Sequence, residues 1–225
     1  MSKHRPPPVG NSLNGFKDLL KPALPREDFR VFVFGPYLPA TETVDSPSDS
    51  TDHQDGLLSH AKYLRYATRK ALEANGFPVD FGETHEVLKF WEDHFRSPDP
   101  ATTEEHHARH LSGAVVIYPC SVGSFCEMGM FARERGIAEK MAAIVHSRFE
   151  QDTSFFRKGL LEVFQQEKGR LDFLDYSNHK ACIEAALRFV EGEYNSAIRR
   201  VRTYKEINLR SKGTFLEKAL GPSTH

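Results

Sequence analysis

The 225-residue chain has no long apolar run, no surplus of charge of either sign and no even set of cysteines. No stretch approaches the roughly 20 apolar residues that a membrane-spanning helix needs. The first eight residues, Met-Ser-Lys-His-Arg-Pro-Pro-Pro, lack the apolar core of a secretory signal. The net charge of −1 gives the chain as a whole no general attraction to nucleic acid or lipid headgroups. These absences predict a cytoplasmic protein that does not bind membranes.

The cysteines and histidines do not form a recognisable metal-binding pattern. The cysteines are Cys120, Cys126 and Cys182. Their odd number and the lack of a C-x-x-C spacing predict reduced thiols. Three histidines have i, i+3 and i, i+4 spacings: His106, His107 and His110. Because no further zinc ligand follows at a suitable spacing, we expect neither a metal nor a cofactor.

Strand patterns and helix patterns alternate along the chain from residue 29 onward. Short β-branched and aromatic runs bounded by Gly or Pro predict five strands, at 29–34, 77–81, 114–118, 141–145 and 171–174. Apolar residues at helical spacing predict helices at 57–75, 85–95, 102–111, 128–140, 155–166 and 179–201.

This alternation predicts an α/β fold with a mostly parallel five-stranded sheet, helices on both faces and a helical extension at the C-terminus. We expect an irregular N-terminal arm (1–28), an α/β domain (29–198) and a basic C-terminal tail (199–225). Residues 39–56 are rich in Ser, Thr and Asp and predict a flexible acidic loop. Ligands of such sheets bind at the carboxyl ends of the strands, so the loops after the first and third strands are the candidate site.

The loop after the third strand, Ser121 to Gly129, reads Ser-Val-Gly-Ser-Phe-Cys-Glu-Met-Gly. It predicts a polar loop and a helix start, where backbone N–H groups and the helix dipole favour an anion. Its one carboxylate, Glu127, is expected in the first helical turn. A carboxylate beside a phosphate-binding loop suits cleavage of a nucleotide's glycosidic bond. The alternative is that Ser121 and Ser124 only cap the helix and Glu127 only complements its dipole.

Two motifs resemble those of the nucleoside 2-deoxyribosyltransferase superfamily. They are Val33-Phe-Gly-Pro-Tyr37 and Ser121-x-Gly123-x-x-x-Glu127-x-Gly129. The second is most similar to the branch of deoxynucleoside 5′-monophosphate N-glycosidases. Similar motifs occur in N-glycosidase-like effectors of bacterial anti-phage systems, including retrons. The resemblance spans roughly residues 29–175 and implies a flavodoxin-like fold that is often dimeric.

The resemblance also implies roles for individual residues. Glu127 would be the nucleophile that attacks the anomeric carbon. The 5′-phosphate would be held by Ser121, Gly123 and Ser124. The sugar and base side would be lined by Gly35, Pro36 and Tyr37. The family usually carries an Asp just before the third strand, but residues 111–114 contain no acid, and Phe125 stands where relatives often have Gly.

Several other residues are accessory candidates. Glu83 follows the second predicted strand, and His107 or His110 is a candidate to protonate the leaving base. The predicted helix at 57–75 carries four basic residues: Lys62, Arg65, Arg69 and Lys70. We interpret them as a solvated face, with a phosphate contact by one of them as the alternative.

The sequence leaves the substrate and the class of protein open. The substrate is expected to be a deoxynucleotide, a ribonucleotide or NAD, bound in a homodimer or a larger complex. A nucleotide-binding sensor without catalysis is the rival interpretation, favoured by the missing Asp. Residues 199–218 contain seven Lys or Arg and two Glu. This basic segment predicts a solvated helix, or a contact with nucleic acid or a nucleoprotein partner.

Overall fold

The computed structural model describes residues 24–39, 43–82 and 100–220, with side chains in the last range given for residues 101–204. Most of the predicted N-terminal arm, the predicted helix at 85–95 and Glu83 therefore lie outside the described residues.

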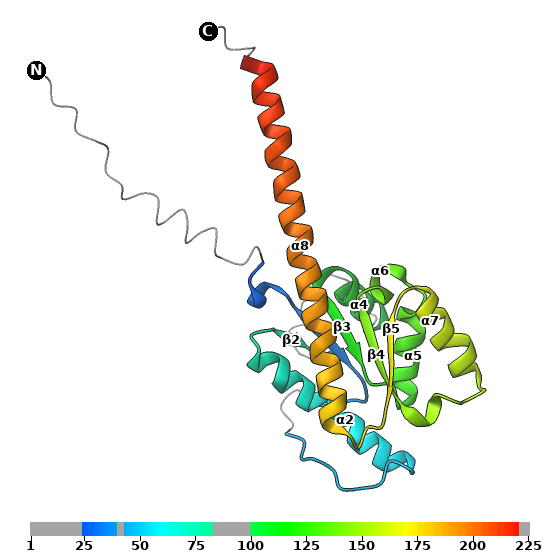
Figure 1. The fold of residues 1–225 in the computed structure, drawn as a ribbon. Helices are drawn as coiled ribbons and strands as arrows, with labels where there is room; N and C mark the ends of the chain where they lie inside the picture. Colours follow the sequence, from blue (N-terminus) through cyan, green and yellow to red (C-terminus); the bar gives the residue numbers. More distant parts are fainter. Residues whose placement is uncertain (1–23, 40–42, 83–99, 221–225) are drawn as a thin grey trace, which may run out of the picture. The chain divides into compact units, whose positions relative to one another are not determined.

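A five-stranded sheet forms the centre of the fold, and every pair of neighbouring strands is parallel. The order β2-β1-β3-β4-β5 is that of flavodoxin-like folds, which confirms the predicted α/β class (Figure 1). The strands are β1 (Val31–Phe34), β2 (Val79–Asp80), β3 (Ala114–Ile117), β4 (Met141–His146) and β5 (Arg170–Leu174). Because β1 and β3 are neighbours, the loops that follow them meet at one edge of the sheet.

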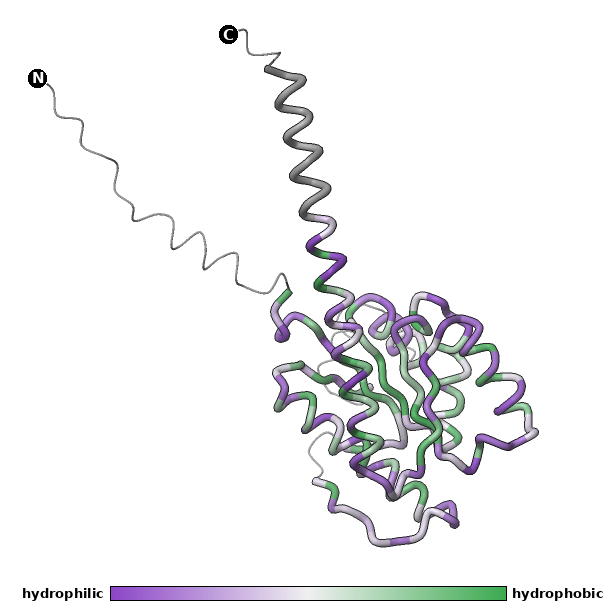
Figure 2. Tube along the Cα trace, viewed as in Figure 1, coloured by the Kyte–Doolittle hydropathy of each residue, from purple (hydrophilic) through white to green (hydrophobic). Residues whose placement is uncertain are grey.

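Both faces of the central strands are covered. All residues of β1, β3 and β4 are buried, as expected for parallel strands with helices on each side. Figure 2 shows that the strands at the centre of the sheet are mostly apolar. On one face, Phe32, Phe34 and Ile117 belong to a single hydrophobic cluster with Met128 and Phe131. The last two residues follow the β3 loop, so this cluster fixes the segment that carries Glu127.

Most described helices lie close to their predicted places. They are α2 (Gln54–Ala74), α4 (Pro100–His106), α5 (Val122–Phe131), α6 (Arg135–Ala138), α7 (Glu162–Gln166) and α8 (His179–Leu220). Shorter helical turns cover Arg26–Asp28, His107–Leu111, Ser147–Phe149 and Phe156–Leu161. The prediction of a single helix at 128–140 is wrong, because α5 begins before Met128 and α6 is separate.

The chain divides into two compact units, residues 26–196 and residues 1–25 together with 197–225. The first unit contains the sheet. In the second unit α8 continues from residue 197 to Leu220, so the predicted tail is helical to that residue. The side chains of Arg199, Arg200 and Arg202 are exposed.

Candidate active site

Ser121 and Ser124 form a reciprocal capping box at the start of α5. Ser121 is the N-cap and its Oγ accepts a hydrogen bond from the Ser124 amide at 3.3 Å. Ser124 Oγ accepts from the amides of Cys120 at 3.0 Å and Ser121 at 2.9 Å. The box satisfies amides that a helix start leaves without partners, so the helix begins at Val122. Glu127 consequently lies in the second turn, and the prediction of a first-turn position is wrong.

The two sequence motifs meet in one cavity of about 630 Å³. Its walls include every residue that the sequence assigned to the nucleophile or to substrate binding: Gly35, Pro36, Tyr37, Ser121, Gly123, Ser124 and Glu127. The remaining lining residues are Leu58, Lys62, Gly82 and Glu104. The parallel register of β1 and β3, which pairs Phe34 with Ile117, brings the two loops together.

Arg65 of α2 holds the loop after β1. Its side chain is 1% exposed; Nε donates to the Val33 carbonyl at 3.1 Å and Nη1 donates to the Pro36 carbonyl at 2.9 Å. The guanidinium carbon lies 4.3 Å from the ring centroid of Phe81, a cation–π distance. The interpretation of Arg65 as part of a solvated face is therefore wrong. Buried carbonyls at the end of a strand need donors, and Arg65 supplies them.

Gly35 gives this loop its direction. Its φ is +151°, and a Cβ at this position would lie 3.3 Å from the Tyr118 carbonyl oxygen. Glycine tolerates both the backbone angle and the close approach. After the turn, the side chain of Tyr37 is 66% exposed at the wall of the cavity.

The structure adds a second carboxylate that the sequence did not single out. Glu104 of α4 lines the cavity together with Glu127. Gly82 leaves room for it, since a Cβ at this position would collide with the Glu104 carboxylate. Oε2 of Glu127 is shielded from solvent. Two carboxylates in one cavity can divide the roles of nucleophile and proton donor.

Neither His107 nor His110 lines this cavity. The His107 side chain is buried, and its Nε2 lies 2.9 Å from Oδ2 of Asp80. Burial alone would raise the pKa of Asp80, but the bonds from His107 and Arg30 outweigh it and lower that pKa. His110 is exposed. The contacts hold His107 beside β2, and its role as a proton donor stays a prediction.

A second cavity, of about 590 Å³, lies against the opposite face of α5. Phe125 lines it, and the Phe125 ring centroid is 4.6 Å from that of Phe156 and 6.0 Å from that of Phe149. The departure of Phe125 from the Gly of similar proteins therefore falls outside the first cavity. We place the candidate site in the first cavity, because it holds Glu127 and Glu104.

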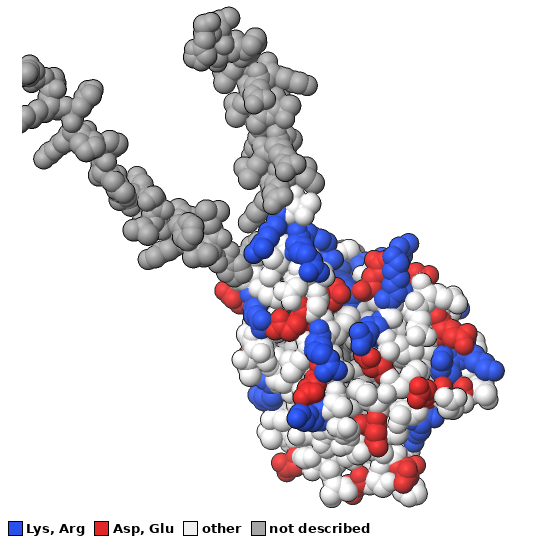
Figure 3. All heavy atoms as spheres, in the orientation of Figure 1, with Lys and Arg blue, Asp and Glu red and all other residues white. Residues whose placement is uncertain are grey.

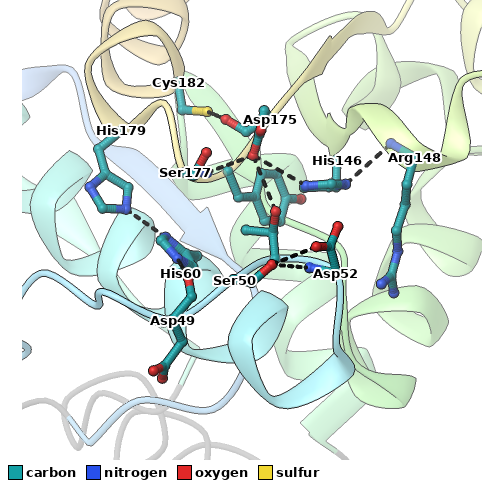
Figure 4. Close-up of polar contacts among 12 residues, drawn as sticks. Asp49, Ser50, Asp52, His60, His146, Arg148, Asp175, Ser177, His179 and Cys182 are labelled. Atoms are coloured by element: carbon teal, nitrogen blue, oxygen red, sulfur yellow. Dashed lines mark hydrogen bonds and ion pairs between the residues drawn. The ribbon is translucent and has the colours of Figure 1, made fainter.

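Histidines fasten the acidic loop to α2 and α8 (Figure 4). His60 Nε2 lies 2.8 Å from the Asp49 carbonyl oxygen, and His60 Nδ1 lies 2.7 Å from His179 Nε2. Because a carbonyl only accepts, His60 donates to Asp49, and with both rings neutral His179 donates to His60. Burial lowers the pKa of His179, and the neighbouring His60 lowers it further.

Further contacts connect the same loop to the ends of β4 and β5. Thr51 Oγ1 donates to Asp175 Oδ1 at 3.4 Å, and His146 Nε2 lies 3.4 Å from the same oxygen (Figure 4). Burial lowers the pKa of His146, although Asp175 opposes the shift. Gln54, at the start of α2, donates to the Cys120 carbonyl at 2.7 Å. The loop is thereby joined to the residue that precedes the capping box.

The surface in view in Figure 3 carries acidic and basic side chains interspersed, without a broad field of one sign. Within the described ranges, no helix is long and apolar enough to cross a membrane. The same ranges contain no group of three or more His, Cys, Asp or Glu placed to hold a metal ion. Cys120, Cys126 and Cys182 are free thiols.

The fold and the cavity define a flavodoxin-like α/β protein with a carboxylate-bearing site at the carboxyl ends of its strands. The model of the STM3845 retron effector protein family matches residues 62–219, more than half of the 225 residues. The chain belongs to this family, and membership gives it a role in anti-phage defence. The match includes Glu104 and Glu127 and begins after the Gly35–Tyr37 loop. A comparison with curated proteins found no match.

Proposed function

We propose that the chain is an N-glycosidase that cleaves the bond between base and sugar in a nucleotide, with Glu127 as the nucleophile. The observation that carries the proposal is the convergence of two motifs, distant in sequence, on one cavity that also holds Glu104. A capping box with only a structural role would require neither the β1 loop nor a second carboxylate at this place. The substrate class comprises deoxynucleotides, ribonucleotides and NAD.

The two carboxylates supply the steps of a double displacement. First, an oxygen of Glu127 bonds to C1′ while the C1′–N bond breaks and its electron pair leaves with the base. Glu104 gives its proton to the departing nitrogen. Water then attacks C1′, the bond from C1′ to Glu127 breaks, and Glu104 takes up the proton of the water. From a nucleotide, the products are a free base and the sugar phosphate. From NAD, nicotinamide leaves as a neutral base without taking a proton, so the products are nicotinamide, ADP-ribose and the proton of the water.

Product analysis by mass spectrometry tests this proposal. The full chain is incubated with NAD, nucleoside mono- and triphosphates and deoxynucleosides, beside Glu127→Gln. Glu134→Gln is the matched control, because Glu134 follows α5 with its side chain 45% exposed and pairs with Arg109. We expect free base from the wild type and the control, and a loss of at least about a thousandfold in Glu127→Gln, as for removal of other nucleophiles.

Two results would contradict the proposal. Equal rates of base release from wild type and Glu127→Gln would show that Glu127 is not the nucleophile. Nucleotide binding without base release, also by protein purified in its native complex, would instead favour a non-catalytic sensor.

A further inference from the structure

Lys62 is the lysine of α2 that lines the candidate cavity. The other basic residues of the helix that the sequence grouped with it are engaged elsewhere. Arg65 donates hydrogen bonds to backbone carbonyls. Arg69 Nε lies 2.7 Å from Oε1 of Glu73, and Lys70 Nζ lies 3.7 Å from Oε2 of the same residue. Lys62 is half-buried, and within the described ranges its ammonium has no ion-pair partner. Its positive charge is thus available to a ligand in the cavity.

The charge of Lys62 reaches the loop that precedes α5. Burial raises the pKa of the Cys120 thiol to about 12, while the charges of Arg148 and Lys62 act in the opposite direction. Cys120 directly precedes the capping residue Ser121. Lys62, the cap Ser121 and Gly123 in the first turn of α5 line the same cavity.

Backbone donors remain at the start of α5. The capping box uses the amides of Cys120, Ser121 and Ser124. It leaves the first-turn amides of Val122 and Gly123, which point out of the helix start. A Cβ at Gly123 would meet no atom within 4 Å, so the space beside this residue is open. The positive end of the helix dipole strengthens the attraction of these amides for an anion.

The charges that line the cavity determine the orientation of a phosphorylated substrate. The carboxylate of Glu127 repels an anion, whereas Lys62 attracts it, and both line the same cavity. A phosphate beside Lys62 lowers the electrostatic energy and leaves the uncharged sugar carbon to the carboxylates. The separation of positive and negative charge in the cavity thus orients a bound nucleotide.

We propose that Lys62 binds the 5′-phosphate of the substrate and so selects nucleotides over nucleosides. The identity of the rest of the substrate rests on the proposed function, whereas binding of the phosphate group does not.

Two measurements on the full chain test the role of Lys62. The first is the affinity for inorganic phosphate at low salt, determined by calorimetry for the wild type, Lys62→Met and Lys70→Met. Lys70→Met removes the same charge from the same helix, but from a side chain that is 58% exposed and faces Glu73. We expect at least a tenfold loss in Lys62→Met, about 1.4 kcal/mol, and a change below twofold in Lys70→Met. Lys62→Arg should retain most of the affinity, and Lys62→Gln repeats the test with a polar side chain.

The second measurement is the ratio of base release from a 5′-monophosphate to that from its matching nucleoside. The ratio should fall at least tenfold in Lys62→Met and stay at the wild-type value in Lys70→Met. Equal phosphate affinity in the wild type, Lys62→Met and Lys62→Gln would overturn the proposal, as would no phosphate binding by the wild type. Phosphate binding that depends on Lys62 without any base release would support the role of Lys62 and contradict the proposed function. Base release with an unchanged ratio in Lys62→Met would support the proposed function and contradict the role of Lys62.

Discussion

Replacement of Arg65 by methionine tests how the candidate site is held in place. Arg65 lies under the loop after β1 and donates to the carbonyls of Val33 and Pro36. Methionine has a similar length and an apolar side chain, so it fills part of the volume but donates no hydrogen bond. Both carbonyls then lose the donors that Arg65 gave them, and the Gly35–Tyr37 loop loses its support.

The magnitude follows from the buried contacts. Each hydrogen bond from a charged group is worth about 1.5–3 kcal/mol, and removal of the buried charge offsets part of the loss. We expect a net destabilisation of about 3 kcal/mol, a large share of the roughly 5–15 kcal/mol that stabilises a typical domain. At roughly 2–4 °C per kcal/mol for a domain of this size, the melting temperature should fall by about 6–12 °C.

Thermal unfolding followed by circular dichroism measures this change. Lys70→Met is the control, because its partly exposed pair with Glu73 at 3.7 Å is worth less than about 1 kcal/mol. A melting temperature of Arg65→Met within about 2 °C of the control would refute the reasoning. It would mean that the carbonyls find other donors at little cost.

Three further predictions concern stability and pH. Because burial lowers the pKa of His146 and His179 below 6.5, the unfolded chain binds more protons as the pH falls below that value, and the melting temperature should decline between about pH 7 and pH 5; a flat profile would contradict this. Gly35→Ala should lower the free energy of unfolding by about 1–3 kcal/mol in a urea titration, because of the positive φ and the nearby carbonyl. Gly192→Ala, at a helical site where the added Cβ meets no atom within 4 Å, should instead raise it by about 0.5–1 kcal/mol. Ser124→Ala should cost about 0.5–2 kcal/mol in the same titration through loss of the capping box, and an unchanged midpoint would show that the box is not needed.

The sheet could be predicted because its signals are local. The apolar runs of β3 and β4 are long enough to mark buried parallel strands, and the two motif loops follow strands that are neighbours. The start of α5 could not be placed in the same way. The composition of this segment, with Pro119, Gly123 and two serines, is that of a loop. The side chain of each serine, however, accepts a hydrogen bond from the backbone amide of the other, and the helix begins at Val122.

In the candidate site, too, the residues with local sequence signals could be predicted and those placed by tertiary packing could not. Glu127 and Gly35 belong to segments that directly follow β3 and β1 and carry recognisable motifs, although Glu127 itself lies in α5. Glu104 and Lys62 come from helices, and which side of a helix faces a cavity depends on its packing against the sheet. The burial of Arg65 could not be predicted for this reason: the other basic residues of α2, Lys62, Arg69 and Lys70, are exposed or half-buried, and only tertiary contacts show that Arg65 is buried.

The central claim, that Glu127 is the nucleophile, is tested most directly by detecting its covalent intermediate. The chain is incubated with a 2′-fluoro analogue of a nucleotide that it cleaves, because the fluorine destabilises the oxocarbenium-like state through which the intermediate forms and breaks down. Peptide mass spectrometry should then find the mass of the sugar phosphate on Glu127, and no adduct in Glu127→Gln. Release of base with the adduct on a different residue would contradict the account.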